Sequence, residues 1–185
     1  LELINIRGVQ TNQDFLINIL SSDEFSKARF DTNFISKKYK DGFSTKNVDA
    51  NKLEIMVIAA LTNQLHYLRE INNDFSKISK EWILISENKS FEFKVISISE
   101  AGFVFDKNKK KFFVELYIDP TNYIFKIKIN DNFYNLRVNK DENVCEVFYG
   151  GSFSQINIFR SSEYESFKNL PKNTIKEENN YLVSP

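Results

Sequence analysis

The sequence contains one cysteine, one histidine and five glycines among its 185 residues. With Cys145 alone, no disulfide framework and no cysteine-based metal site can form within the chain, which suits a reducing compartment. His66 is also alone, and a metal site would need several such ligands. The adjacent glycines Gly150-Gly151 lack the spacing and the following helix of a phosphate-binding loop. The sequence therefore offers no activated nucleophile and no metal or phosphate anchor.

A surplus of charge and a long apolar run are also missing. The 25 Lys and Arg residues balance the 25 Asp and Glu residues, and the isoelectric point is about 6.8. Binding to nucleic acid depends on a surplus of positive charge, and the basic run at residues 107–111 is typical of a solvated turn. No apolar run approaches the roughly 20 residues of a membrane-spanning helix. We therefore expect neither a nucleic-acid nor a membrane partner.

Aromatic residues are abundant, with 18 Phe and 8 Tyr in a chain that is 42% hydrophobic. This composition can fill a sizeable core, and a length of 185 residues favours one domain with fragments of neighbours. The chain opens with Leu1-Glu2-Leu3, without an initiator Met, and stops at Ser184-Pro185 just after a new apolar run. These ends indicate a piece of a longer polypeptide.

The first 43 residues predict short helices. Thr11 is a suitable N-cap, Asp14 lies near the positive end of the helix, and apolar residues then repeat at helical spacing. Asp31 offers a further capping group before an apolar pair. Residues 40–43 form a turn around a glycine, and we place a boundary there.

One long helix is predicted from its N-cap, Asp49, to about Phe75. The residues of its apolar stripe are Leu53, Val57, Ala60, Leu61, Gln64, Leu65, Leu68 and Ile71. Ile55, Met56 and Ile58 widen this stripe, so the first half should be buried on most sides. The polar residues of the second half are Gln64, His66, Arg69 and Glu70. We expect the second half to emerge toward solvent.

Residues 81–160 contain some eight short segments of alternating apolar and polar residues, the pattern of strands with one apolar face. The turns between them, such as Asn130-Asp131-Asn132 and Gly150-Gly151, are too short for parallel crossovers, so neighbouring strands must be antiparallel. Such strands form a sandwich or close into a barrel, and the apolar helix is the natural filler of a barrel. The predicted fold class is α+β: a long helix packed inside an eight-stranded antiparallel β-barrel, with short N-terminal helices.

The remaining candidates for chemistry are better explained by structure. Cys145 is at an inward-facing position of a strand, so it is expected to pack in the core. A nucleophilic thiol would need a nearby base or cation. Trp82 is expected to be a core or interface anchor. Glu142 and Glu146 have no identifiable partner for paired-carboxylate chemistry. No catalytic residue is predicted, and residues 161–180, which are polar and lose the alternation, are predicted to be a linker.

Several segments resemble the alpha subunits of biotin-dependent acyl-CoA carboxylases. Those similar to the end of the biotin carboxylase domain are Gly8-Val9-Gln10-Thr11-Asn12, Phe15-Leu16, Phe25 and Asp31-Thr32-Asn33-Phe34-Ile35. Those similar to propionyl-CoA carboxylases in particular are Tyr39-Lys40-Asp41-Gly42-Phe43 and Trp82-Ile83-Leu84. Tyr181-Leu182-Val183-Ser184-Pro185 resembles the opening of the biotinyl carrier domain. The family's Met-Pro-Gly and Ala-Met-Lys-Met motifs and its ATP-grasp core are not in this sequence.

The resemblance implies that residues 1–43 are the C-terminal remnant of a biotin carboxylase domain, residues 44–160 a subunit-interaction domain and residues 161–185 a linker toward the biotinyl carrier domain. The parent would be a ligase, a propionyl-CoA carboxylase or else a methylcrotonyl-CoA or other acyl-CoA carboxylase. It would use biotin, ATP and Mg, and this fragment would hold no cofactor. The implied partners are the carboxyltransferase beta subunit and the biotin carboxylase and biotinyl carrier domains of the same chain. The location would be cytoplasmic in a bacterium and the mitochondrial matrix in a eukaryote.

In this family the loop between the helix and the first strand hooks onto the partner, and here it is residues 73–80. The implied subunit-interface residues are Asn73, Asp74, Phe75, Ser76, Lys77, Ile78 and Trp82. Phe75 and Ile78 would be apolar anchors, or they would plug the end of the barrel. A function of another class, binding a small apolar ligand as lipocalin-like barrels do, needs an empty lumen.

Overall fold

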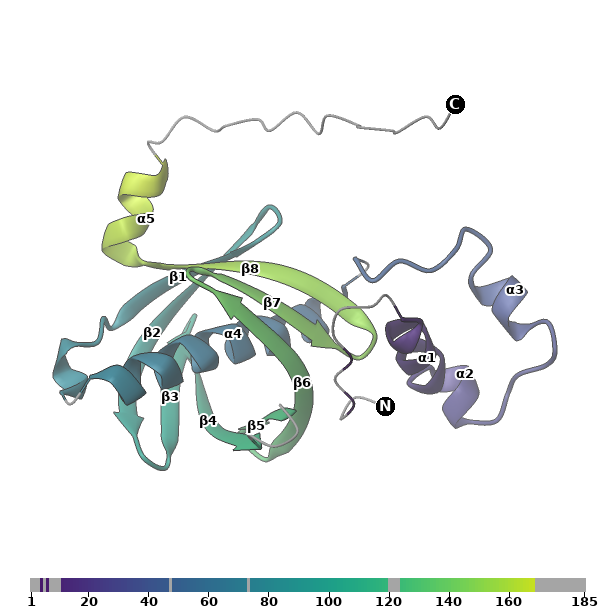
Figure 1. Cartoon of the computed structure of the whole chain (residues 1–185), viewed down its shortest axis with the longest axis horizontal. Helices are drawn as coiled ribbons and strands as arrows, with labels where there is room; N and C mark the ends of the chain where they lie inside the picture. Colours follow the sequence, from purple (N-terminus) through teal and green to yellow (C-terminus); the bar gives the residue numbers. More distant parts are fainter. Residues whose placement is uncertain are drawn as a thin grey trace.

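The structure of the protein, a computed structural model, describes residues 4, 6, 11–46, 48–72, 74–119 and 124–168. Three short helices come first, α1 (Gln13–Leu20), α2 (Asp23–Ser26) and α3 (Phe34–Lys38), followed by the long helix α4 (Ala50–Ile71) and the 3-10 helix η1 (Phe75–Lys77). The strands are β1 (Glu81–Ser86), β2 (Lys89–Ser99), β3 (Gly102–Lys107), β4 (Lys110–Asp119), β5 (Ile124–Ile129), β6 (Asn132–Asp141), β7 (Val144–Tyr149) and β8 (Ser152–Arg160). Helix α5 (Ser161–Lys168) follows β8 (Figure 1).

The eight strands form one closed barrel in the order β1 to β8, and every neighbouring pair is antiparallel. Pairing of β1 with β8 closes the barrel, with Trp82 opposite Arg160 and Ser86 opposite Ile156. The two-residue turn between β7 and β8 has φ of +56° at Gly150 and +73° at Gly151. Glycine adopts such angles without steric penalty. The predicted barrel and this predicted hairpin turn are confirmed.

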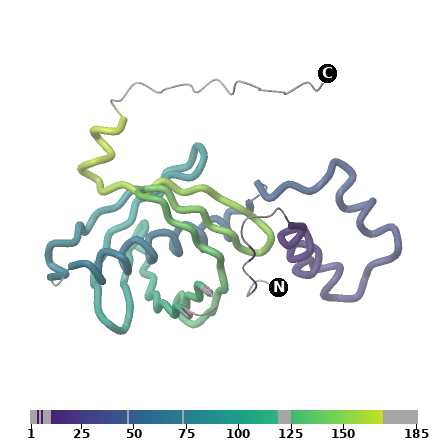
Figure 2. Tube along the Cα trace, in the orientation of Figure 1, coloured from purple at the N-terminus to yellow at the C-terminus, as the bar shows by residue number. Residues whose placement is uncertain are grey.

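Helix α4 lies inside the barrel, as Figure 2 also shows. Its seven consecutive residues from Met56 to Thr62 are each exposed by 1% or less. Because an α-helix turns once in about 3.6 residues, seven buried neighbours place the barrel wall on every side of it. Asp49 is the N-cap, and its Oδ1 accepts a 2.9 Å hydrogen bond from the backbone N–H of Lys52. The predicted position of the helix inside the barrel and its predicted N-cap are confirmed, but the helix ends at Ile71 rather than near Phe75.

The lumen is filled unevenly around this helix. Strands β2 to β5 carry five large inward-facing side chains: Phe93, Phe103, Phe105, Phe112 and Phe125. The buried side chains of β1, β7 and β8 include small ones, among them Cys145 and the pair Ser86 and Ser154, whose Oγ atoms are 2.6 Å apart. Helix α4 lies closest to β7 and β8. The small side chains let the helix approach that wall, and the aromatic rings fill the wider remainder of the lumen.

Helix α4 is longer than the lumen that encloses it. At about 1.5 Å per residue, its 22 residues extend about 33 Å. The strands have six to eleven residues, and at about 3.3 Å per residue and a tilt of about 40° to the barrel axis they span only about 15–28 Å along that axis. The predicted emergence of its second half is correct, although Gln64 stays buried at 9% exposure. Ile71, the last residue of the apolar stripe, is 59% exposed and belongs to this emerging half. The stripe continues in sequence beyond the point where the barrel ends.

The start of α1 differs by one residue from the prediction. The N-cap is Asn12 rather than Thr11, whose Oγ1 accepts a 3.3 Å hydrogen bond from the N–H of Gln13. Helix α2 is capped by Ser22, which accepts a 3.4 Å hydrogen bond from the N–H of Phe25. Of these first three helices, as far as the structure describes them, α1 contributes buried residues and α2 and α3 contribute none.

The predicted linker begins as helix α5. Tyr164 and Phe167, three residues apart, pack against Phe159 of β8 with ring centroids 5.9 and 4.6 Å away. This apolar pair at helical spacing covers the seam where β1 meets β8. Its packing against the barrel stabilises the helix. The rest of the predicted linker, including the segment from Tyr181 to Pro185, lies outside the described residues, as do Gly8, Val9 and Gln10.

Candidate docking site

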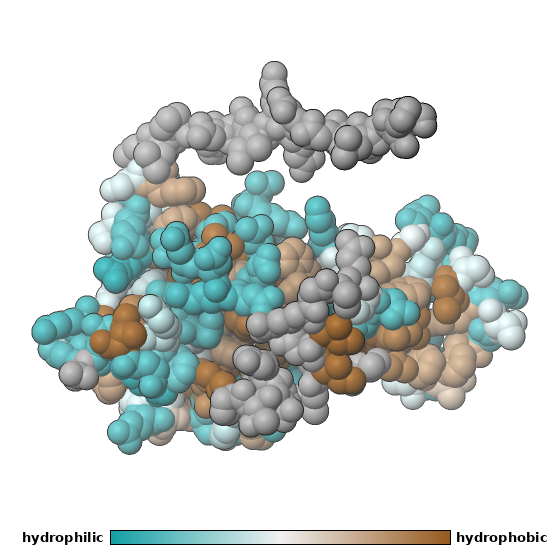
Figure 3. Space-filling model, viewed as in Figure 1, coloured by the Kyte–Doolittle hydropathy of each residue, from teal (hydrophilic) through white to brown (hydrophobic). Residues whose placement is uncertain are grey.

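The end of the barrel at which α4 leaves the lumen carries exposed apolar side chains. Tyr67 is 50% exposed, Ile71 59% and Phe75 40%. Tyr67 and Ile71 are four residues apart in α4 and share one face of the helix, and Phe75 begins η1 shortly afterwards. Figure 3 shows apolar side chains interrupting the hydrophilic surface at this end, on the left of the view. We refer to Tyr67, Ile71 and Phe75 as the apolar tip.

The helix end that carries the tip is tied to the rim of the barrel. Arg69 Nη1 donates a 2.9 Å hydrogen bond to the carbonyl oxygen of Ser99, at the end of β2. The Arg69 guanidinium also lies 5.3 Å from the centre of the Phe103 ring. The Lys140 ammonium of β6 lies 4.1 Å from the centre of the Tyr67 ring. These contacts fix the last turns of α4 relative to β2, β3 and β6.

The polar residues of the predicted interface loop form a local cap. Asp74 Oδ1 accepts hydrogen bonds from the Ser76 hydroxyl at 2.6 Å and from the Ser76 N–H at 3.0 Å, and both bonds lower the pKa of Asp74. Lys77 is exposed, with its Nζ 3.8 Å from Asp74 Oδ2. Asn73 lies outside the described residues. The cap orders the loop, in which Phe75 stands between the polar residues Asp74 and Ser76 in the sequence.

The other two apolar residues predicted for the interface are buried. Ile78 is 6% exposed and Trp82 2% exposed, and both belong to the barrel core. Trp82 Nε1 donates a 2.8 Å hydrogen bond to the carbonyl oxygen of Ser79. Ile78 therefore plugs the barrel end, the alternative that the sequence left open. Of the predicted apolar anchors, Phe75 is the one exposed to solvent.

Tyr67, Ile71 and Lys140 belong to this site and were missed in the sequence. Ile71 continues the apolar stripe of the helix, and this periodicity alone does not distinguish an exposed position from a buried one. The signal that could have found it is the polar second half of the helix, where Glu70, with a side chain 62% exposed, is its direct neighbour. Lys140 is 73 positions from Tyr67 in the sequence, and only the closed barrel brings the two together.

The single histidine and the single cysteine have the surroundings of structural residues. Burial lowers the pKa of His66, and so does the Arg69 guanidinium, whose Nη2 lies 3.1 Å from His66 Nδ1. Burial raises the pKa of Cys145 to about 12, against a smaller opposing effect of a hydrogen bond with Asn63. The thiol therefore stays protonated at neutral pH. Within the described ranges, no three His, Cys, Asp or Glu side chains are grouped to hold a metal ion.

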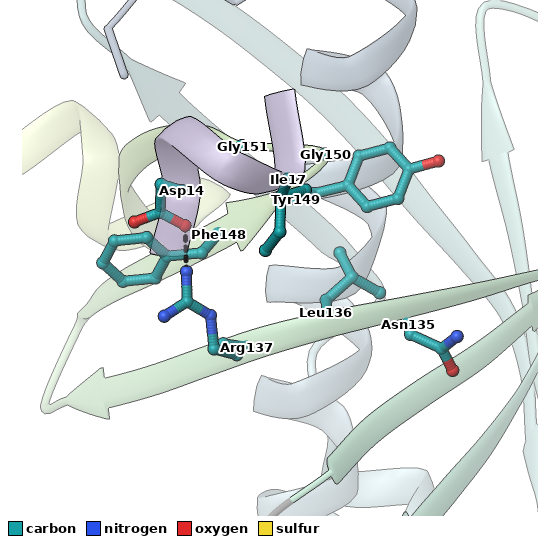
Figure 4. Close-up of a pocket in the computed structure, with 9 residues that line it drawn as sticks. All are labelled: Asp14, Ile17, Asn135, Leu136, Arg137, Phe148, Tyr149, Gly150 and Gly151. Carbon is teal, nitrogen blue, oxygen red and sulfur yellow. Dashed lines mark hydrogen bonds and ion pairs between the residues drawn. The ribbon is translucent and has the colours of Figure 1, made fainter. Parts of the chain in front are cut away.

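At the opposite end of the barrel, α1 packs against the β7–β8 turn and β6 (Figure 4). The cavity between them measures about 10 Å³, and its lining residues are Asp14, Ile17, Asn135, Leu136, Arg137, Phe148, Tyr149, Gly150 and Gly151. One water molecule needs about 10–15 Å³, so this space is too small for an organic ligand. The Arg137 guanidinium and the Asp14 carboxylate form an ion pair there. This end is a packing contact between two parts of the chain.

Comparison with models of known protein families gives no match, and comparison with curated proteins gives no significant similarity. In the part of the chain that the structure describes, no helix has both the length and the apolar character needed to span a membrane.

Proposed function

We propose that this chain is a non-catalytic assembly domain of a biotin-dependent acyl-CoA carboxylase, most similar in its segments to the alpha subunit of propionyl-CoA carboxylase. It would dock the alpha subunit onto the carboxyltransferase beta subunit. In the parent enzyme, ATP and bicarbonate carboxylate biotin, which carries the carboxyl group to propionyl-CoA and gives methylmalonyl-CoA. Biotin, ATP and Mg would be bound by other domains of that enzyme.

The observation that carries this proposal is that α4 fills the barrel and then extends beyond it, ending in exposed apolar side chains. Met56 to Thr62 are buried within the barrel, whereas Tyr67 and Ile71 are at least half exposed. A long helix inside an eight-stranded antiparallel barrel is also the fold that the resemblance implies. The resemblance of the quoted segments and the arrangement of helix and strands are two independent observations, and both support the same proposal.

The chemistry of the apolar tip suits a protein partner. Interfaces typically place aromatic and aliphatic anchors at the centre and polar groups at the rim. Phe75 and Ile71 are exposed anchors of this kind, and the charged side chains of Glu70, Asp74 and Lys77 lie beside them in the sequence and are at least half exposed. Burial of the tip against a partner would remove apolar surface from water. This stabilises a complex by about 25 cal/mol for each Å² of apolar surface buried.

The rival function, a barrel that binds a small apolar ligand, gains no support from the geometry. Such a barrel needs an empty lumen. Here the lumen contains α4, with Leu61 and Leu65 fully buried, and the aromatic rings of the facing wall, among them Phe103 and Phe105, are also fully buried.

The test is binding of the carboxyltransferase beta subunit of a propionyl-CoA carboxylase to the immobilised chain. Since hot-spot truncations cost about 2 kcal/mol or more, Phe75→Ala and Ile71→Ala should each raise Kd by about thirtyfold or more. The matched control is Phe133→Ala, because Phe133 is a similarly exposed ring, at 53%, on the outer barrel wall. If the double variant Phe75→Ala with Ile71→Ala binds the beta subunit as tightly as the unaltered chain does, docking through the tip is rejected.

A further inference from the structure

The first three helices are attached to the barrel mainly through α1. Helix α1 buries Gln13, Ile17 and Ile19, whereas no residue of α2 or α3 is buried in the part of the chain that the structure describes. A second attachment lies in the segment before α4, where the N–H of Phe153 donates a 2.8 Å hydrogen bond to the carbonyl oxygen of Thr45. The orientation of the helices on the barrel thus depends on a small contact area.

The backbone of α1 lies directly on the turn between β7 and β8. A Cβ atom added to Gly151 would be 2.5 Å from the carbonyl oxygen of Asp14 and 2.8 Å from the backbone nitrogen of Asn18. Real Cβ atoms do not approach backbone atoms so closely, since this lies well inside van der Waals contact. Gly151 therefore serves two purposes, the positive φ of the turn and the close approach of α1.

Arg137 supplies the charged part of the same contact. Its guanidinium forms an ion pair with the Asp14 carboxylate, and its Nη1 donates a 3.3 Å hydrogen bond to Gln13 Oε1. It also lies 4.6 Å from the centre of the Phe148 ring. The side chains of Arg137 and Asp14 are 15% and 21% exposed, so salt screens this pair less than a surface pair. Figure 4 shows the pair between α1 and β6.

The other side chains of α1 hold the rest of the helical segment. Asn18 Oδ1 accepts a 2.7 Å hydrogen bond from the Tyr39 hydroxyl. The Phe15 ring lies 5.0 Å from the Tyr39 ring and 5.2 Å from the Phe43 ring, measured between centroids. A change in the position of α1 would therefore carry residues up to Phe43 with it.

We propose that Gly151 and Arg137 form the joint that fixes the orientation of the helical segment, residues 13–43, on the barrel. The joint lies at the end where Lys52, in the first turn of α4, donates a 2.9 Å hydrogen bond to the Gly150 carbonyl oxygen. This is the end opposite to the apolar tip, and the inference does not depend on the proposed partner. The end at Gly150-Gly151 thus contacts another part of the same chain, whereas Tyr67, Ile71 and Phe75 at the other end are exposed among the described residues.

The test measures a distance between the two parts in the full chain. Spin labels are placed at Thr32→Cys, in the helical segment, and at Lys111→Cys, in β4, because both positions are exposed. Cys145 is buried, and burial raises its pKa to about 12, so it does not compete for the label. Pulsed electron resonance then gives the distribution of distances between the two labels.

Two joint variants are compared with two matched controls. Gly151→Ala adds the clashing Cβ, and its control is Gly42→Ala, since Gly42 also has positive φ, +84°, but nothing within 4 Å of its Cβ position. Arg137→Gln removes the joint's ion pair, and its control is Arg160→Gln, which removes an exposed pair with Glu163. Near-UV circular dichroism of Trp82 verifies that the barrel is folded in each variant.

We expect one narrow distance distribution in the unaltered chain and in both controls. Gly151→Ala and Arg137→Gln should broaden it severalfold while the Trp82 signal is retained. A broad distribution in the unaltered chain would overturn the joint, as would a distribution in either joint variant as narrow as in its control. Because no beta subunit is present, these outcomes are independent of the docking function.

Discussion

Lys107 of β3 donates a 2.6 Å hydrogen bond to Glu54 of α4 and so ties the first half of the helix to the barrel wall. The two side chains are 17% and 30% exposed. Burial alone would raise the pKa of Glu54, but the hydrogen bond and charge of Lys107, with the charge of Lys110, lower it overall. The ionised carboxylate is therefore favoured by folding.

This pair predicts a specific dependence of stability on pH. Because the pKa of Glu54 is lower in the folded chain, its contribution is present above the unfolded pKa, about 4.5, and is lost as the pH falls through the folded pKa. We expect Glu54→Gln to reduce the free energy of unfolding by about 1–2 kcal/mol at pH 7. The difference from the unaltered chain should shrink in acid, as measured by urea denaturation at several pH values.

The control for this prediction is Glu24→Gln. Glu24 also accepts a 2.6 Å hydrogen bond from Lys38 within an ion pair, but its side chain is 50% exposed, and exposed pairs contribute little to stability. If the two substitutions had equal effects at pH 7, the helix would not be anchored through Glu54.

The enclosure of α4 predicts unequal effects of truncations along one helix. Leu61 is fully buried and Ile71 is 59% exposed. Leu61→Ala should lower the free energy of unfolding by about 2–5 kcal/mol, whereas Ile71→Ala should change it by no more than about 0.5 kcal/mol. Denaturation by urea measures both. Similar losses would mean that α4 lies against the outside of the barrel.

Cys145 should be unreactive in the folded chain. Its thiol is buried, and the raised pKa of about 12 leaves almost no thiolate at pH 8. We expect no modification by iodoacetamide under native conditions and full modification in denaturant, as detected by mass spectrometry. Thr32→Cys gives an exposed thiol as the positive control in the same sample. Rapid native labelling of Cys145 would show that the barrel wall opens at β7.

The local patterns of the sequence predicted the main elements. Alternation in the strands, the Asp49 cap and the Gly150-Gly151 turn are local signals, and each corresponds to the observed structure. The period of α4 also predicted burial on most sides. It could not give the height of the barrel, which depends on all eight strands, and so it did not show at which residue the apolar stripe leaves the lumen.

The contacts that position the site and the joint are not local. Asp14 and Arg137 are separated by 123 positions in the sequence, and nothing in either neighbourhood indicates the other. The contact of Gly151 with α1 could not be predicted from the sequence either. The positive φ of the turn is already a sufficient reason for a glycine at this position. Phe75 and Ile78 have similar sequence surroundings, yet the closure of the barrel exposes the first and buries the second.

Docking through the apolar tip is tested most directly by hydrogen–deuterium exchange of the chain with and without the carboxyltransferase beta subunit. We expect slower exchange in residues 67–80 when the beta subunit is saturating, and unchanged exchange at the Gly150-Gly151 turn. Protection confined to the outer wall around Phe133, or no protection anywhere, would contradict docking through Tyr67, Ile71 and Phe75.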